Sequence, residues 1–476
     1  MKKFNPLLKL YQGTTYTVLD KFQMILSALI LFSIFLSCDN FIDVELPNSQ
    51  LTANSVYEDK TTANAAMTQV YAKMRDSGLF TGYAFGLSNL MGNYTDELAF
   101  YGNPQEGTTD FYNGIVLPSN SSIKSLWNNS YNQIYGANAI LEGVANSANL
   151  LSTDRDQLKG EALFTRALIH FYLANLFGSI PYIRTTDYQK NSMISKEPAN
   201  AVYGNCIEDL NLAVALLPGT YKSPDRTRPN KFSARALLSR VYLYTQQWDE
   251  ASNEASAVLN NTALYSVESN LNKTFLKEST ATIWQFSPNT ATGNSLEAQT
   301  FVFTVGPPPL SALTTTLVNT FTTADKRKLS WIASVTKEGA TWYYSSKYKS
   351  KITSASTEYS VLLRLSEMYL IRAEARAHAG DLIGSKEDLN VIRNTAGLLN
   401  TTAISQSEIL EAILKERQLE FFCEFGHRFF DLKRFNALDT ALPSVKPGWS
   451  SYKAQLPLPE SELLLNKNLI PQNTGY

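Results

Sequence analysis

Segments with apolar residues at helical spacing recur in pairs along this chain. The paired segments are 161–177 with 202–217, 232–245 with 248–259, and 362–379 with 382–393. Residues three and four positions apart share one face of an α-helix, so each segment is predicted to be an amphipathic helix. Small residues in the first helix of a pair let the two helices nest, and each hairpin buries a face only against its neighbour. The chain is therefore predicted to be mainly α, built from stacked helical hairpins.

In two of these pairs the second helix opens in the same way. Residues 247–251 and 380–384 each place an aromatic or apolar residue, and then a small one, shortly after the turn. This pattern resembles degenerate tetratricopeptide repeats with irregular spacing. The sequence thus indicates tetratricopeptide-like helical hairpins.

Two further helices are predicted before the first pair. Ser55 and Glu58 have the spacing of a capping box, and Gly78 lies where the helix that they start would end. A second helix begins near Ser122 and carries Trp127 at helical spacing with other apolar residues. We expect Trp127 to belong to the core.

Three stretches show no helical period and are predicted to form an irregular, loop-rich lobe. A loop as long as 79–121 in a compact domain is usually functional, and this one is rich in Tyr and Phe. The stretch 265–357 contains a β-like run at 283–286. The lobe is assigned to 79–121, 265–357 and 436–476, and the helical scaffold to 55–78, 122–264 and 358–435, within one domain of residues 55–476.

The N-terminal segment has the parts of a bacterial lipoprotein signal. Lys21 precedes the apolar run Met24–Leu36, and Ser37 and Cys38 follow it. A transmembrane helix is the alternative, but it needs about 20 apolar residues and this run is shorter. We therefore expect a signal peptide at 1–37, a lipidated Cys38, and a tether at 38–54 that holds the protein to a membrane.

Charge and cysteine usage exclude several classes of function. A formal net charge of −1 without any block of Lys or Arg argues against nucleic acid as a partner. With three His and no C-x-x-C or H-E-x-x-H motif, neither a metal site nor another cofactor is expected. Cys206 and Cys423 could pair, but Cys206 falls on the apolar face of a helix, so buried free thiols are predicted.

Several motifs resemble those of the SusD/RagB family of surface nutrient-binding lipoproteins. Residues 456–463 and 471–476 are similar to the closing motif of this family, and residues 416–434 are similar to its charged helix and loop. The repeat helices are similar in 365–375 and 390–393, and the N-terminal helices at Trp127, Ala137–Asn138 and Arg166–Ala167. The resemblance implies a superhelical scaffold that carries an irregular ligand-binding lobe. It also implies an outer-membrane lipoprotein at the cell surface that captures oligosaccharide, or in some members peptide, for a SusC-like TonB-dependent transporter.

Carboxylates in the charged helix raise the alternative of a glycoside hydrolase. Glu416, Glu420 and Glu424 are four residues apart, so a helix stacks them on one face. Two carboxylates a few ångströms apart could supply acid and nucleophile. However, Arg417 and Arg428 lie in the same segment, and a structural ion-pair network is the preferred interpretation. We therefore expect a binding protein and not an enzyme.

Exposed aromatic planes beside amides and carboxylates are what a sugar-binding surface requires. The predicted ligand-binding residues are Tyr94, Asp96, Phe100, Tyr101, Asn103, Trp331, Trp342 and Tyr343. In the family that the chain resembles, residues just after a similar Asp-Glu pair often reach the ligand, which favours Phe100, Tyr101 and Asn103. The alternative is that Tyr94 and Asp96 pack or cap locally. A repeat scaffold that binds only protein is the third functional hypothesis, and the aromatic loops argue against it.

Overall fold

Long helices that pack in sequence order form most of the protein. A computed structural model describes residues 56–476, together with Val18 and Gln23. Apart from these two residues, the predicted signal lies outside the described residues, as do Cys38 and the predicted tether 38–54. The long helices are α3 (Lys60–Asp76), α6 (Ser121–Asn146), α7 (Ser152–Phe177), α9 (Ala199–Leu216), α10 (Lys231–Tyr244), α11 (Trp248–Leu259), α15 (Leu365–His378), α16 (Leu382–Thr395) and α17 (Gln406–Phe421), and the shorter α18 (His427–Arg434) follows the last of them. Consecutive members such as α10 and α11, or α15 and α16, pack against each other, which confirms a mainly α fold of helical hairpins.

Short elements fill the segments between the hairpins. The short helices are α4 (Leu87–Tyr94), α5 (Gly107–Asn113), α8 (Tyr188–Asn191), α12 (Leu296–Phe301), α13 (Thr315–Thr320), α14 (Lys326–Trp331), α19 (Leu438–Ala441) and α20 (Glu460–Leu465), and the 3-10 turns are η1 (Leu271–Lys273), η2 (Ser451–Ala454) and η3 (Lys467–Leu469). The segment 79–121 is therefore not one long loop, because α4, β1 and α5 lie in it. In α4, Leu87, Leu90, Met91 and Tyr94 do fall at helical spacing, but the helix is only eight residues long and its polar side chains are buried too, so the period is too short to stand out.

Two antiparallel sheets complete the fold. In the larger sheet the order is β1 (Leu98–Phe100), β3 (Ser311–Leu313), β5 (Ala340–Ser345) and β4 (Ile332–Lys337). The smaller sheet pairs β2 (Thr282–Phe286) with β6 (Ser360–Arg364), and every residue of both strands is buried. Strand β2 confirms the predicted β-like run. The helix predicted from residue 362 begins instead at Leu365, because the first residues of that apolar run pair with β2.

Helix boundaries differ from the predicted ones where a different side chain caps the helix. Helix α3 begins at Lys60, because the Asp59 carboxylate accepts hydrogen bonds from the amides of Thr61 and Thr62 and replaces the expected Ser55 cap. Gly78 follows this helix with a φ of +81°, as expected for a residue just beyond a helix end. Helix α7 begins at Ser152, well before residue 161, and residues 152–157 are polar and exposed or partly exposed.

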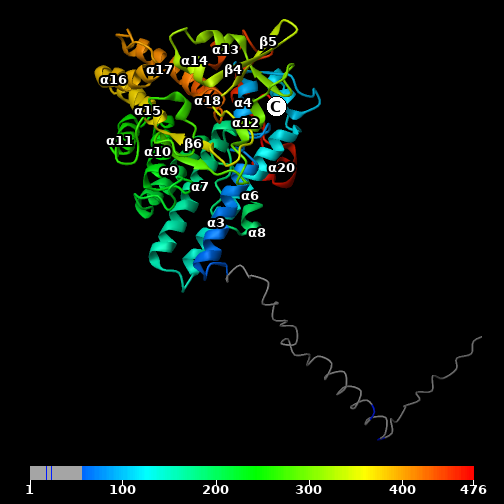
Figure 1. Cartoon of the computed structure of the whole chain (residues 1–476). Helices are drawn as coiled ribbons and strands as arrows, with labels where there is room; N and C mark the ends of the chain where they lie inside the picture. Colours follow the sequence, from blue (N-terminus) through cyan, green and yellow to red (C-terminus); the bar gives the residue numbers. More distant parts are fainter. Residues whose placement is uncertain (1–17, 19–22, 24–55) are drawn as a thin grey trace, which may run out of the picture. The chain divides into compact units, whose positions relative to one another are not determined.

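Within residues 56–476 the core has one large cluster among the helices, a smaller one beneath the larger sheet, and a third among α15, α16 and α17. Trp127 is 3% exposed and belongs to the first cluster, as predicted. The second cluster contains Leu98 and Leu313 from the sheet and Cys423. Cys206 and Cys423 are both buried and free, which confirms the prediction for the two thiols. Figure 1 shows β4 and β5 beside α13 and α14, at the end of this unit where the larger sheet lies. The exact division into scaffold and lobe stays a prediction.

Candidate ligand-binding site

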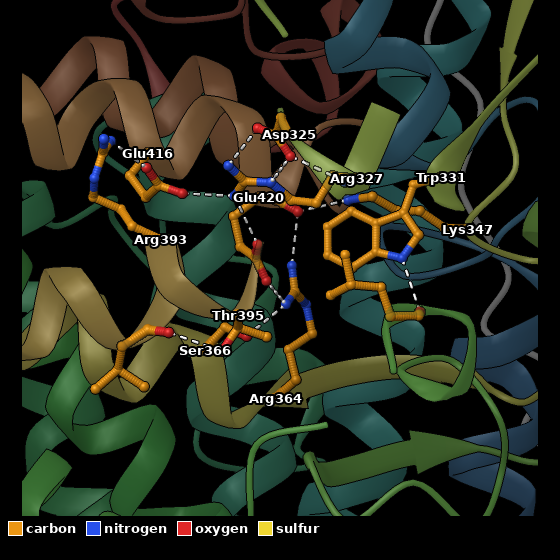
Figure 2. A network of polar contacts seen from close by, with 12 residues as sticks. Asp325, Arg327, Trp331, Lys347, Arg364, Ser366, Arg393, Thr395, Glu416 and Glu420 are labelled. Atoms are coloured by element: carbon orange, nitrogen blue, oxygen red, sulfur yellow. Dashed lines mark hydrogen bonds and ion pairs between the residues drawn. The ribbon is translucent and has the colours of Figure 1, made fainter. Parts of the chain in front are cut away.

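The three carboxylates of the charged segment lie in a buried ion-pair network, although α17 ends at Phe421, so Glu424 does not stack on the same helix face as predicted. Arg327 contacts Glu416 at 2.7 Å and Glu420 at 3.0 Å, and Figure 2 shows this guanidinium between the two carboxylates. Arg364 pairs with Glu420 and lies 2.9 Å from Glu424, which also pairs with Lys347. The predicted structural network is confirmed.

Electrostatics at Glu420 do not suit a general acid. Burial alone would raise its pKa, but Arg364 and Arg327 lower the pKa of Glu420 to about 2. A catalytic acid must hold its proton at working pH, which requires a raised pKa. Glu420 is therefore a permanently charged structural group at neutral pH, and this geometry does not support the glycosidase hypothesis for it.

Two of the predicted ligand contacts are core residues instead. Trp331 is 1% exposed, and its indole nitrogen donates to the carbonyl of Leu271 at 3.0 Å. Tyr94 is 1% exposed, and its hydroxyl donates to the carbonyl of Lys453. The prediction that these rings contact a ligand is wrong, because each side chain is enclosed and its polar atom is already paired.

Asp96 is occupied by an internal ion pair. Arg428 donates two hydrogen bonds to its carboxylate, at 2.9 and 2.7 Å, and Gln418 donates a third at 3.3 Å. Asp96 therefore has a structural role and is not free to contact a ligand. This outcome matches the alternative that Asp96 packs locally.

The larger sheet decides which of the remaining aromatic residues face solvent. Leu98, Leu313 and Tyr343 form one cross-strand row, and this row packs on the second hydrophobic cluster. Side chains alternate along a strand, so Phe100 lies on the same inner side as Leu98. Phe100 and Tyr343 thus point toward the core side, although both are partly exposed.

Alternation places Tyr101 and Trp342 on the opposite face of the sheet. Tyr101 is 44% exposed and Trp342 is partly exposed. From the register, they are about four residues apart along the strands and two strands apart across the sheet, or about 13 Å by about 10 Å. The two rings are therefore available on one surface, at a separation that suits an extended ligand.

A segment that the sequence did not single out as a contact runs between these two rings. Gly306 lies against Trp342, so closely that a Cβ on it would be 2.3 Å from the indole. The Leu310 carbonyl accepts hydrogen bonds from the amides of Tyr101 and Gly102 at 2.6 and 3.0 Å. Residues 306–310 therefore connect the two aromatic positions and fix them. The run Gly306-Pro307-Pro308-Pro309 indicates a turn in the sequence, but the sequence does not indicate that this turn lies against the sheet.

Asn103 is exposed at the end of the Tyr101 loop. Its side-chain oxygen accepts a hydrogen bond from the amide of Gln105 at 3.0 Å, which closes a local turn. Its amide nitrogen donates no hydrogen bond to any of residues 56–476, and the residue is exposed to solvent. Asn103 therefore remains a candidate contact beside Tyr101.

Comparisons with known proteins identify the family. A family model described as "Starch-binding associating with outer membrane" matches residues 40–243, and a model described as "SusD family" matches residues 314–476. The chain belongs to the SusD/RagB family. It is 28% identical to SusD-like protein P2 of Formosa agariphila, over 91% of this chain and 96% of that protein.

Solved structures of SusD-like proteins share the fold. A SusD superfamily protein from Bacteroides vulgatus superposes with a TM-score of 0.77 at 22% identity, over 88% of this chain and 100% of that one. A structure described as a laminarin-binding SusD-like protein gives 0.73 at 23% identity, with the same coverage. Surface glycan-binding protein A from Bacteroides thetaiotaomicron gives 0.74 at 17% identity, again with that coverage. Within residues 56–476 of this SusD/RagB protein, every helix is too short or too polar to cross a bilayer.

The Asp-Glu pair of this SusD/RagB protein holds the aromatic loop from two sides. Asp96 pairs with Arg428, whereas Glu97 points inward and accepts a hydrogen bond from the amide of Cys423 at 3.3 Å. Burial, and then the neighbouring charge of Asp96, raise the pKa of Glu97 to about 8. Asp96 therefore attaches the start of β1 to α18, and Glu97 attaches it to the segment between α17 and α18, so the two carboxyls fix the position of the loop that carries Tyr101.

Proposed function

We propose that this protein binds an oligosaccharide on the face of the larger sheet that carries Tyr101 and Trp342. The observation that carries this proposal is the partial exposure of both rings on one face, with Asn103 beside the first. Sugar rings offer flat apolar faces edged by hydroxyls, so aromatic planes and amides are suitable partners. The description of the matching family as starch-binding, and the glycan-binding names of two structural relatives, support the same ligand class. A peptide ligand is the alternative.

We further propose that the protein is a surface lipoprotein that passes its ligand to a SusC-like TonB-dependent transporter without cleaving it. The lipoprotein signal ending at Cys38 and the outer-membrane association in the family description support this placement. The buried pairing of Glu416, Glu420 and Glu424 supports binding without hydrolysis. Purification of the lipidated protein from outer membranes tests the partner, because a transporter should be recovered with it.

Calorimetric titration with a panel of neutral oligosaccharides tests the ligand site. Stacking on an aromatic ring contributes about 0.5–1.5 kcal/mol beyond area burial, so Tyr101→Ala or Trp342→Ala should weaken binding about 2- to 10-fold. Tyr188→Ala is the matched control, because Tyr188 is an exposed aromatic residue (75%) on α8. Binding that is unchanged in both sheet variants would place the ligand elsewhere.

A further inference from the structure

Helix α6 forms the floor of a long groove that lies on a different element from the proposed sugar surface. Every fourth residue from Trp127 to Gly143 lines it, and these are Trp127, Tyr131, Tyr135, Ala139 and Gly143. Residues four apart lie on one face of a helix, so this floor is about 24 Å long. Two adjoining cavities of about 610 and 590 Å³ share Tyr135, and each has the size of a small-molecule site.

The walls of the groove are held in place by hydrogen bonds. On one side, the Tyr131 hydroxyl donates to the carbonyl of Pro181 at 2.9 Å, and the amide of Thr186 donates to Glu142 at 2.9 Å. On the other side, the Asn466 amide group donates to the carbonyl of Ile194 at 2.8 Å, which joins the segment after α20 to the connection 181–194 between α7 and α9. The groove is therefore formed before any ligand arrives, so little ordering cost would oppose binding.

The charge of the lining selects the class of ligand. Among residues 56–476, no Lys, Arg or His lines either cavity, whereas three carboxylates do, from Glu58, Glu142 and Glu462. An acidic glycan, a phosphate or an acidic peptide would therefore meet like charge in the lining, and the nearby Lys73 ammonium already donates to the Asn132 side chain at 2.9 Å. The lining suits an uncharged molecule, or one that carries positive charge.

The remaining side chains favour a sugar among uncharged molecules. Tyr135 is 52% exposed at the junction of the two cavities, so its ring is available to stack. Asn128 and Asn132 are exposed one position beyond Trp127 and Tyr131, so amide groups run beside the aromatic floor. Aromatic planes with adjacent amides match the apolar faces and hydroxyl edges of a sugar chain.

We propose that the α6 groove is a second binding site, for a linear, uncharged oligosaccharide. The ligand class rests on the proposed function, but the site does not, because no residue of the groove belongs to the larger sheet. Two sites on one protein would hold a long glycan at two points and raise its effective affinity.

The test separates the two sites by substitution in the full-length protein. Maltoheptaose and laminarihexaose are titrated into the wild type, Tyr135→Ala, the double variant Tyr101→Ala/Trp342→Ala, and a triple variant that combines all three. Tyr188→Ala again serves as the control, because it is exposed on α8 and lines neither cavity. Ala139→Trp, which fills the groove floor, is a second and independent way to close the site.

We expect the double variant Tyr101→Ala/Trp342→Ala to retain one binding event, at the α6 groove. Adding Tyr135→Ala or Ala139→Trp to the double variant should lower the affinity of that remaining event at least fivefold. The inference is overturned, and the proposed function stands, if the double variant abolishes all binding while Tyr135→Ala binds like the wild type. The reverse pattern overturns the sheet site alone. Absence of any glycan binding by the wild type overturns both. If a neutral peptide binds in a Tyr135-dependent manner and neither glycan does, the sugar assignment of the groove is wrong.

Discussion

Arg428 binds Asp96 through two hydrogen bonds of 2.9 and 2.7 Å, although 332 residues separate them along the chain. Asp96 lies just before β1, and Arg428 lies in the first turn of α18. The pair is largely shielded, with side-chain exposures of 11% for Arg428 and 12% for Asp96. It therefore connects the loop that carries Tyr101 with the charged C-terminal segment.

Loss of this pair should destabilise the fold. Asp96→Ala leaves the guanidinium of Arg428 shielded without a partner, and this costs about 3 kcal/mol of unfolding free energy. Urea denaturation measures the loss. Glu338→Ala is the control, because Glu338 forms only an exposed pair with Lys337 and should change stability by less than about 1 kcal/mol. Equal effects of the two substitutions would contradict a structural role for Asp96.

Glu420→Gln should destabilise the protein at neutral pH and much less in acid. The pKa of Glu420 is about 2 in the folded protein and about 4.3 in an unfolded chain. Its carboxylate therefore contributes stability above pH 4.3, and this contribution, about 3 kcal/mol, is lost as the pH falls toward 2. Denaturation curves should show that the difference in unfolding free energy between wild type and variant is smaller at pH 3 than at pH 6. Glu411→Gln, on the exposed side of the same helix, is the control and should show a small gap at both pH values.

Glu97 should have the opposite pH dependence. Its pKa is about 8 in the folded protein, so between pH 4.3 and 8 the unfolded chain releases a proton that the folded protein keeps. The free energy of unfolding therefore decreases as the pH rises through this range. Glu97→Gln resembles the protonated acid and removes this decrease, so its stability relative to the wild type should increase from pH 5 to pH 8. A constant difference at the two pH values would show that Glu97 is not the group that titrates.

Local patterns predicted the helices that have both a polar and an apolar face. The segment 248–259 coincides with α11. An ion-pair network around Glu420 was correctly expected, but its partners Arg327 and Arg364 come from distant segments and not from the neighbouring arginines of the charged segment. Helix α4 was missed because its apolar period extends over only eight residues, and β1 and β3 were missed because three-residue strands carry almost no period.

The site was predicted less well, because exposure is decided by pairing between distant segments. Trp331 and Trp342 both occur in an irregular, aromatic stretch and look equivalent in the sequence. The end of α14 directs Trp331 into the core, whereas β5 carries Trp342 on the outer face of the sheet. The packing of α14 decides the first case and the register between β3 and β5 decides the second, and no short-range pattern encodes either of them.

Cys38→Ala should release the protein from membranes without changing its fold. Acyl chains contribute about 0.8 kcal/mol for each buried CH₂ group, so they supply most of the membrane affinity of a lipoprotein. Fractionation should recover the wild type with membranes and the variant as soluble protein, with the same melting temperature for both. Wild type found soluble in the periplasm would contradict the lipoprotein signal, and protease treatment of intact cells tests whether the protein faces outward.

Core and surface aromatic residues should respond oppositely to truncation. Trp331→Ala removes a ring that is 1% exposed, so it should cost about 3–5 kcal/mol of unfolding free energy. Tyr101→Ala removes a ring that is 44% exposed, so it should change stability by less than about 1 kcal/mol and weaken a bound oligosaccharide instead. Thermal melts and calorimetric titrations of both variants separate the two effects. If Tyr101→Ala lowers the melting temperature as much as Trp331→Ala and leaves the affinity unchanged, Tyr101 belongs to the packed structure and the outer face of the sheet is not the sugar site.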